Sequence, residues 1–246
     1  MKNIEFYSTV PGLPDLYPIV KAKDALPMWA KSARDSYVKK KKDSIGRMNH
    51  IYQCPGIFDL LNHGYIIPMW HDVVISTNGN SDEFTWTIPT SDLAEVRPDT
   101  ALIESQSNGL GAVMPIKPWS LNTLVKVNTP WHVVAPRGVK LLIIPIAYPD
   151  RFEFESSIGM LNPGHSNEIN IQLYYNVQKG DVLIKAGTPL AHVIPLSETN
   201  YNLVCREMNS LDKLWQAKKK YFSNATFKLK RNTIQEMYHK HFGKEQ

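Results

Sequence analysis

The stretch SSIGMLNPGHSNEINIQLYYN, residues 156–176, decides the fold class, because its second half has a two-residue period. In INIQLYYN, residues 169–176, apolar and polar side chains alternate, and RFEFES, residues 151–156, shows the same pattern. Successive side chains of a β-strand point to opposite faces, so this alternation is typical of strands with one buried and one solvated face. The stretch therefore predicts a mainly β protein.

Strand patterns continue on both sides of this stretch, from about residue 65 to residue 196. The segments are short and mostly rich in β-branched or aromatic residues, and turn sequences such as Asn-Gly, Pro-Arg-Gly and Lys-Gly-Asp separate many of them. No helical pattern intervenes, so we expect an antiparallel domain that is closed or sandwiched, like a jelly roll. The segments are HDVVIST, EFTWTI, TALIES, NTLVKVN, WHVVA, VKLLIIPI, RFEFES, EINIQLYYN, DVLIKAG and PLAHVIPL.

Residues 1–64 show a different, mixed pattern of extended and helical pieces. We expect a short helix after Asp24, and a second that starts at Pro55 and ends before Gly64, which suits a left-handed cap. The run Lys39–Lys42 favours a solvated loop over a nucleic-acid contact, because like charges in a row are usually hydrated. We expect this segment to pack on the β domain as an embellishment.

Residues 197–246 are expected to be helical. Ser210 is a suitable N-cap for a first helix, and TIQEMYHKHF, residues 233–242, has the periodicity of a second. These patterns predict three parts: an N-terminal segment over 1–64, a β domain over 65–196 and a C-terminal helical segment over 197–246.

Composition and charge exclude several classes of protein. The 246 residues carry a formal net charge of +5 and include two cysteines, Cys54 and Cys205, too few for a disulfide framework. The mild positive charge permits a phosphate-bearing partner without requiring one. No apolar run is long enough to span a membrane, and no secretory signal is visible. Histidine spacing gives no metal signature and no catalytic motif surrounds Cys54, so we expect no metal site and no cofactor.

Residues 131–196 resemble the superfamily of trimeric dUTP pyrophosphatases and dCTP deaminases in three places. Pro136-Arg137-Gly138 with VKLLIIP is similar to the turn and strand before that family's phosphate-binding motif. GMLNPGHSNEI, residues 159–169, matches the spacing of its nucleoside-binding hairpin, and IKAGTPLAHVIPL resembles its late strand. The resemblance implies a β-clip (a distorted jelly roll), a homotrimer and a vestigial ligand pocket. The residues expected around that pocket are Asn162, His165, Glu168, Tyr148 and His192.

The charged groups that this superfamily uses are replaced here. Its phosphate-binding Arg-Ser pair corresponds to Ile146 and Ala147, which cannot balance phosphate charge. Its catalytic Asp corresponds to Asn162, whose amide cannot act as a general base at neutral pH. Its sugar-stacking Tyr corresponds to His165, whereas Glu168 is kept. We therefore expect the scaffold without the chemistry, and no catalytic residue.

The whole chain also resembles an uncharacterised family of tailed phages, particularly T4-like phages of marine cyanobacteria. The segments CPGIFDLLNHGYIIPMWHDVVI, APRGVKLLIIP and AGTPLAHVIPL carry this resemblance. It implies a phage-type origin, with the cytoplasm of the infected host and the virion as expected locations. It implies no particular chemistry.

Two functions from different classes follow from these observations. The first is a non-catalytic, self-associating protein that acts as a virion component or binding module, with a homotrimer and other virion proteins as partners and without nucleic acid or membrane. The second is a nucleotide-binding enzyme or sensor with altered chemistry around Asn162, His165 and Glu168. A cupin-like metal oxygenase is a third reading.

Overall fold

The computed structural model of the chain describes residues 2–43, 49–89, 101–106, 115–197, 199–224 and 231–243. Its strands form three sheets with mostly antiparallel pairing, so the prediction of a mainly β protein with helices is confirmed. The strands are β1 (Asn3–Ser8), β2 (Val20–Lys21), β3 (Tyr65–Pro68), β4 (Val73–Asn78), β5 (Thr85–Thr87), β6 (Ile103–Ser105), β7 (Val125–Val134), β8 (Leu141–Ile144), β9 (Phe154–Ser156), β10 (Gly159–Leu161), β11 (Glu168–Tyr175), β12 (Lys179–Ile184), β13 (Pro189–Pro195) and β14 (Asn202–Glu207).

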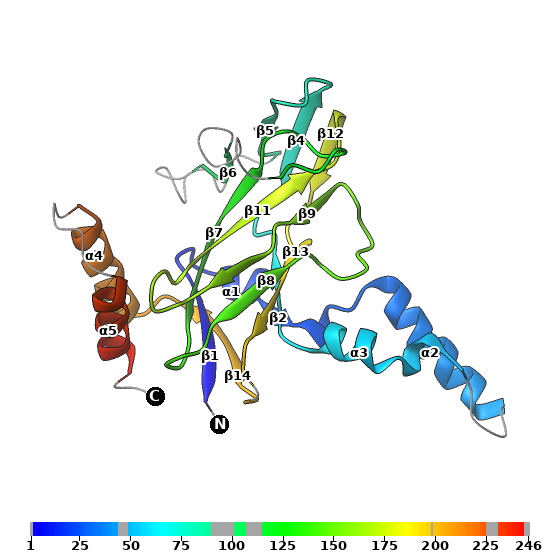
Figure 1. Cartoon of the computed structure of the whole chain (residues 1–246), viewed down its shortest axis with the longest axis horizontal. Helices are drawn as coiled ribbons and strands as arrows, with labels where there is room; N and C mark the ends of the chain where they lie inside the picture. The colour runs from blue at the N-terminus through cyan, green and yellow to red at the C-terminus, as the bar shows by residue number, and fades with distance from the viewer. Residues whose placement is uncertain are drawn as a thin grey trace.

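The longer helices lie on two opposite sides of the sheets (Figure 1). α2 and α3 extend away on one side, and α4 and α5 pack together on the other. Within the described ranges, no helix is both long and apolar enough to cross a membrane. The helices are α1 (Leu13–Leu16), α2 (Met28–Asp43), α3 (Pro55–Asn62), α4 (Ser210–Asn224) and α5 (Arg231–Phe242), with short 3-10 helices η1 (Ala22–Asp24) and η2 (Ile51–Gln53).

The largest sheet pairs β1, near the N-terminus, with β14, which precedes the C-terminal helices. Its strand order is β14-β1-β7-β11-β9, and β6 also pairs with β7. β1 runs parallel to β14, with Asn3 opposite Asn202, and antiparallel to β7. Parallel neighbours need a long connection, which here is almost the whole chain. The sheet therefore reaches beyond the expected boundaries at 65 and 196 on both sides.

The strand β7 contains a proline that the sequence patterns did not bridge. The two strands expected before and after Pro130 form one continuous strand instead. Proline has no N–H to donate, and the partner strand β11 shifts register at this level, between Glu168 and Asn170. The Thr129 hydroxyl donates a hydrogen bond to the Ile169 carbonyl at 2.5 Å. A bulge thus accommodates the proline within a central strand.

The other two sheets are smaller, with strand orders β10-β8-β13-β3-β2 and β12-β4-β5. The alternation expected from residue 169 onward is confirmed, since every second residue of β11 is buried. The buried residues of β11 are Ile169, Ile171, Leu173 and Tyr175, and they join one core with residues of all three sheets.

Two of the expectations for the N-terminal helices are wrong, and two are confirmed. α2 spans 16 residues and includes the run Lys39–Lys42, so the short helix and the solvated loop expected there are wrong. The exposed lysines extend the helix because their unbranched side chains are good helix formers. α3 starts at Pro55 as expected, and Gly64 adopts the expected left-handed conformation at φ 83°.

Candidate functional site

The loop that joins β10 to β11, two strands of different sheets that do not pair with each other, carries the residues that resemble a nucleoside-binding hairpin, and we call this loop the hairpin for that resemblance alone. The Asn162 side-chain oxygen accepts a hydrogen bond from the Gly164 N–H at 3.1 Å, and its carbonyl accepts one from the His165 N–H at 2.8 Å. Asn162 thus satisfies the backbone of its own turn, as Asn commonly does. Its amide oxygen acts here as a local structural acceptor.

The end of this hairpin packs directly against α5. A methyl group added at Gly164 would lie 2.8 Å from Gln235 Cγ and 3.3 Å from His239 Nε2. The first distance is shorter than real carbon contacts, so a residue without a side chain allows the close approach. The loop expected to border an open pocket is therefore covered by a helix.

Glu168, the residue retained from the superfamily pattern, is held by basic neighbours. Its carboxylate lies 3.3 Å from the Lys219 ammonium group of α4, and His132 stands opposite it on β7. Burial would raise the pKa of Glu168, but the charges of Lys219 and His132 outweigh this and lower the pKa below its ordinary value of 4.5. A carboxylate stabilised in this way is a weak base.

A polar network beneath α4 adjoins this hairpin. The Tyr7 ring stacks on the His132 ring with centroids 5.1 Å apart. The Tyr7 hydroxyl oxygen accepts hydrogen bonds from the side-chain amides of Asn167 at 3.1 Å and Gln216 at 2.9 Å. Burial raises the pKa of Tyr7 to about 12, so the phenol stays neutral. The network joins β1, the hairpin and α4.

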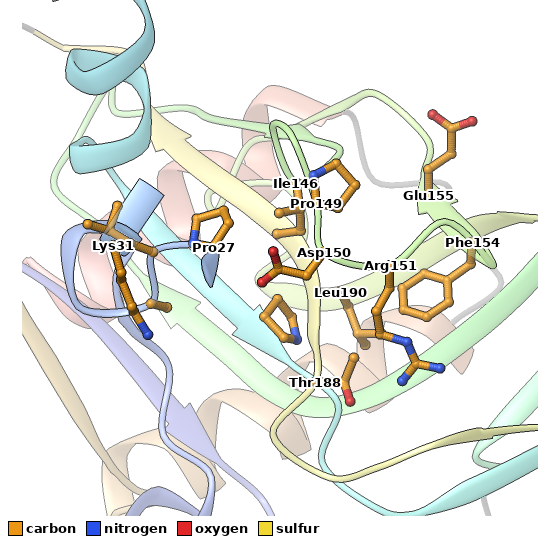
Figure 2. Close-up of a pocket in the computed structure, with 13 residues that line it drawn as sticks. Pro27, Lys31, Ile146, Pro149, Asp150, Arg151, Phe154, Glu155, Thr188 and Leu190 are labelled. Carbon is orange, nitrogen blue, oxygen red and sulfur yellow. The ribbon is translucent and has the colours of Figure 1, made fainter. Parts of the chain in front are cut away.

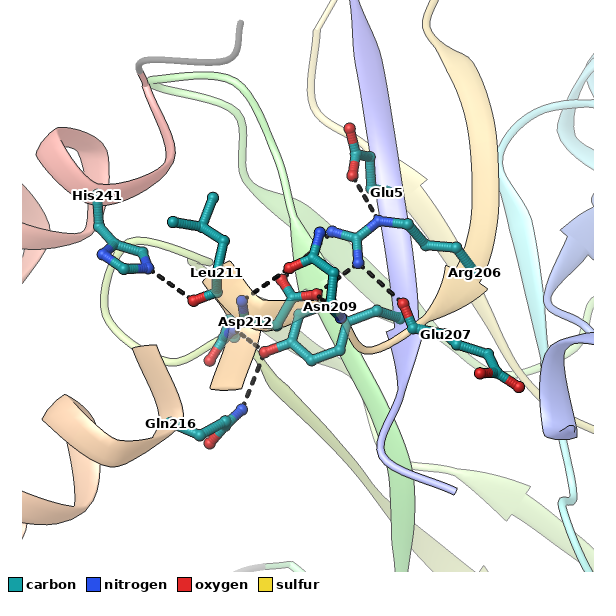
Figure 3. A network of polar contacts seen from close by, with 10 residues as sticks. Glu5, Arg206, Glu207, Asn209, Leu211, Asp212, Gln216 and His241 are labelled. Atoms are coloured by element: carbon teal, nitrogen blue, oxygen red, sulfur yellow. Dashed lines mark hydrogen bonds and ion pairs between the residues drawn. The ribbon is translucent and has the colours of Figure 1, made fainter. Parts of the chain in front are cut away.

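Arg206 continues this network between two carboxylates (Figure 3). Its guanidinium donates to Glu5 at 2.8 Å and to the fully buried Asp212 at 2.5 Å. The Asp212 carboxylate also accepts from the Asn209 N–H at 2.9 Å, and the Asn209 side chain accepts from the Asp212 N–H at 2.9 Å. The N-cap of α4 is therefore Asn209, and the expectation of Ser210 was wrong by one residue.

Tyr148 lies away from the hairpin, on the side of α2. Its carbonyl accepts a hydrogen bond from the Trp29 indole N–H at 2.9 Å, and the two rings meet edge to face at 5.7 Å. Tyr148 has a positive φ of 52° and its side chain is 55% exposed. It does not fill a pocket at residues 162–168.

His192 is a buried residue of β13. Its Nε2 lies 2.5 Å from the His63 carbonyl oxygen at the end of α3. Burial is the main reason that the pKa of His192 is lowered, so the ring is neutral at physiological pH. His192 contacts the end of α3, whereas the hairpin contacts α4 and α5 on the opposite side of the sheets (Figure 1). The five residues expected to share a pocket are therefore distributed over separate places.

A pocket of about 340 Å³ lies instead where α2 meets the loop between β8 and β9 (Figure 2). Thr188, in the turn before β13, also lines this pocket. Ile146, which the predicted resemblance would align with a phosphate-binding Arg, lies in the wall of this pocket. The lining is mostly apolar: Ala25, Leu26, Pro27, Ile146, Pro149, Phe154, Pro189 and Leu190, with Thr188 and the charged residues Lys31, Asp150, Arg151 and Glu155.

Most charged groups of this pocket already have protein partners. The Asp150 carboxylate accepts the Met28 N–H with its two oxygens at 2.9 and 3.1 Å, so it caps α2 from a distant loop. Arg151 pairs with Glu153 at 3.0 Å. Glu155 is likewise paired, with Lys117. Lys31 is exposed and forms no ion pair with any described residue, so its ammonium group is available to a ligand.

Other sequence candidates occupy structural positions. Cys54 is the N-cap residue of α3 and is partly buried. Within the ranges that the structure describes, no group of three or more His, Cys, Asp or Glu side chains is placed to hold a metal ion.

No known family model matches this chain, and a search of curated proteins finds no match. The resemblances of residues 131–196 and of the whole chain therefore stay predictions.

The pocket and the Arg206 network were both missed by sequence reasoning. The pocket brings together residues more than a hundred positions apart, for which one sequence offers no signal. The pattern Asn209-x-x-Asp212 could have identified the true start of α4, because a side-chain acceptor three residues after an N-cap is a capping signature.

Proposed function

We propose that this chain is a non-catalytic, self-associating protein of phage type, which acts as a virion component or a binding module. The single observation that carries the proposal is the covered hairpin. A side chain at Gly164 would require Gln235 of α5 to shift, and Glu168 is paired with Lys219 of α4. Residues in the positions of a superfamily active site serve here to attach helices.

An exposed apolar patch supports self-association. In the sheet that contains β8, Leu142 stands opposite Met160 on one side and opposite Ile194 on the other. Paired residues in a sheet share a face, so these side chains form one row. Met160 is 58% exposed, and Leu196, near the end of the same row, is 45% exposed. We call Leu142, Met160, Ile194 and Leu196 the outer patch.

The outer patch adjoins an edge strand. β10 ends its sheet and pairs with β8 alone among the described strands. Ile158, directly before β10, is 72% exposed. An unpaired strand edge beside apolar side chains is a template for association with another chain. We propose that a second copy of this chain covers the edge and the patch.

Two matched variants test this surface. Met160→Glu places a charge in the outer patch and should shift the protein toward monomer in size-exclusion chromatography with light scattering. Leu214→Glu is the control, because Leu214 is 51% exposed but lies on α4. Equal mass distributions for wild type and Met160→Glu would contradict association through the patch.

The virion version of the proposal needs a separate experiment. Mass spectrometry of purified virions from the phage that encodes the chain should find it at a fixed ratio to the major structural proteins. Its absence from virions would leave the binding-module version, whose partners would then be sought in the infected cell.

A second candidate, a nucleotide-binding sensor or enzyme with altered chemistry, is favoured by the pocket in Figure 2. Its apolar wall could accept a base, and Lys31 could pair with a phosphate. A nucleotide present at a hundredfold excess over its dissociation constant should stabilise the folded chain by about 2.7 kcal/mol. No thermal shift with any nucleotide, or a shift that Lys31→Ala leaves unchanged, would exclude binding at this pocket.

A further inference from the structure

A second hollow, of about 600 Å³, lies at the end of α5 and is unusually basic. It forms where the start of β1, the turn between β7 and β8 and the last turn of α5 come together at one edge (Figure 1). Buried Ala135 and Phe242 are among its lining residues. The polar residues in the lining are Lys2, Arg137, Glu236, His239 and Lys240.

The cations of this hollow lack protein partners. Lys2, Arg137 and Lys240 are exposed and form no ion pair with any residue that the structure describes. Elsewhere Arg206 and Lys219 are paired with carboxylates. Among the described residues that line the hollow, Glu236 contributes the one carboxylate against these three positive charges, so this lining attracts anions.

A rigid turn positions Arg137. The Val139 N–H donates to the Pro136 carbonyl at 3.1 Å, which closes a tight turn between β7 and β8. Gly138, the third residue of this turn, has φ 84°, a conformation that favours glycine. The Pro136 ring and the hydrogen bond that closes the turn thus restrict the backbone around Arg137, which lowers the entropy that ordering a ligand contact costs.

His239 also lines the hollow, with its Nε2 turned toward Gly164 of the hairpin. This nitrogen is buried and has no hydrogen-bond partner within the described residues. Burial, followed by the nearby charge of Arg137, lowers the pKa of His239, so the ring is neutral at pH 7. The positive charge of the hollow therefore comes from Lys2, Arg137 and Lys240.

The dipole of α5 could by itself explain why some of the positive charges of the hollow lie at the end of this helix. Cations near the last turn of a helix offset its carbonyl groups, and His239 and Lys240 lie in the last turn of α5. The helix dipole does not explain Lys2 and Arg137, which come from the residue before β1 and from a turn. The His239 carbonyl already accepts the Gly243 N–H at 2.8 Å. Convergence of cations from three segments therefore needs another explanation.

We propose that this hollow binds a phosphate-bearing anion. A phosphate group offers several acceptor oxygens around a concentrated negative charge, which suits a guanidinium fork flanked by two ammonium groups. The volume admits more than one phosphate. The site is separate from the outer patch and from the pocket in Figure 2, so it does not depend on the proposed self-association.

Isothermal titration calorimetry on the full chain at constant ionic strength tests the proposal, with inorganic phosphate, tripolyphosphate and a deoxynucleoside triphosphate as probes. Tripolyphosphate should bind more tightly than phosphate. Equal affinities for tripolyphosphate and the nucleotide identify the phosphates as the recognised group, and a tighter nucleotide identifies a nucleotide as the carrier. Absence of tripolyphosphate binding at millimolar concentration would overturn the proposal.

Matched variants locate the binding. Arg137→Ala and Lys240→Ala should each weaken tripolyphosphate binding about tenfold or more, because each removes a charge-assisted contact. Arg137→Lys should retain part of the affinity. Arg34→Ala, which removes an exposed arginine of α2, should leave it unchanged. Binding that Arg137→Ala does not weaken would contradict the assigned site.

Discussion

The two sides of this molecule differ in whether their polar side chains have hydrogen-bond or ion-pair partners among the described residues. On the side of α4 and α5, the hairpin residues Asn162 and Glu168 are satisfied by their own loop and by a lysine of the covering helix. On the side of α2, an open pocket with an apolar wall leaves Lys31 unpaired. The positions that we expected to form a ligand pocket therefore contact the covering helices, whereas the pocket beside α2 forms where distant segments meet.

The largest expected effect comes from breaking the network that holds α4 on the hairpin side. Asp212→Ala should lower the free energy of unfolding by about 3 kcal/mol, because the partly buried Arg206 guanidinium loses one of its two carboxylate partners and α4 loses a cap. Urea unfolding measures this loss. The control Asp35→Ala removes an exposed ion pair with Arg34 and should cost less than about 0.5 kcal/mol. A loss below about 1 kcal/mol for Asp212→Ala would contradict the role of this network.

A smaller effect tests the contact between hairpin and α5. Gly164→Ala should lower the free energy of unfolding by about 1–2 kcal/mol, since the new methyl group lies too close to Gln235. Gly159→Ala is the matched control, because nothing lies within 4 Å of its added methyl group. Adding Gln235→Ala to Gly164→Ala should recover part of the loss. If Gly164→Ala behaves like Gly159→Ala, α5 does not cover the hairpin.

The opposite side of the molecule gives the next prediction. Asp150→Ala should destabilise the first turn of α2 by about 1 kcal/mol, because the Met28 N–H loses its acceptor. Hydrogen exchange of the α2 amides should rise near Met28 and stay unchanged in α4. Asp150→Asn keeps an acceptor and should have a smaller effect. Unchanged exchange in Asp150→Ala would show that the pocket loop does not hold α2.

The smallest effect concerns pH. The pKa of Glu168 is lowered in the folded chain, so its ion pair contributes stability above the ordinary value of 4.5 and loses it as pH falls through the lowered pKa. Because the group is partly solvated, we expect at most about 0.5 kcal/mol. Unfolding of wild type and Lys219→Met compared between pH 6 and pH 3 measures it. The wild type should lose slightly more stability on acidification, and an identical pH profile would contradict the pairing.

Local patterns predicted the strands between residues 65 and 196 well, because alternation and turn residues can be recognised within a few consecutive residues. They failed where a distant segment decides the outcome. Pro130 divides a strand by sequence rules, yet a bulge in β7 opposite Ile169 and the Thr129 hydroxyl keep β7 continuous. The start of α2 depends on Asp150, a carboxylate more than a hundred residues away.

The candidate site was predictable only in part, for a related reason. Spacing placed Asn162, His165 and Glu168 on one hairpin, whereas in the structure they lie on a loop and at the start of β11, between two strands that belong to different sheets and do not pair. Spacing could not reveal that α5 would cover Gly164, because helix packing on a loop depends on shape and not on local pattern. Tyr148 and His192 were grouped with the hairpin by resemblance and lie elsewhere.

Light scattering on the purified chain across a range of concentrations tests the central claim most directly. Self-association predicts a mass that is an integral multiple of the chain mass of 28.0 kDa, three times that value for the expected trimer, and a shift to lower mass in Met160→Glu. A single species of 28.0 kDa at every concentration would contradict the proposed role.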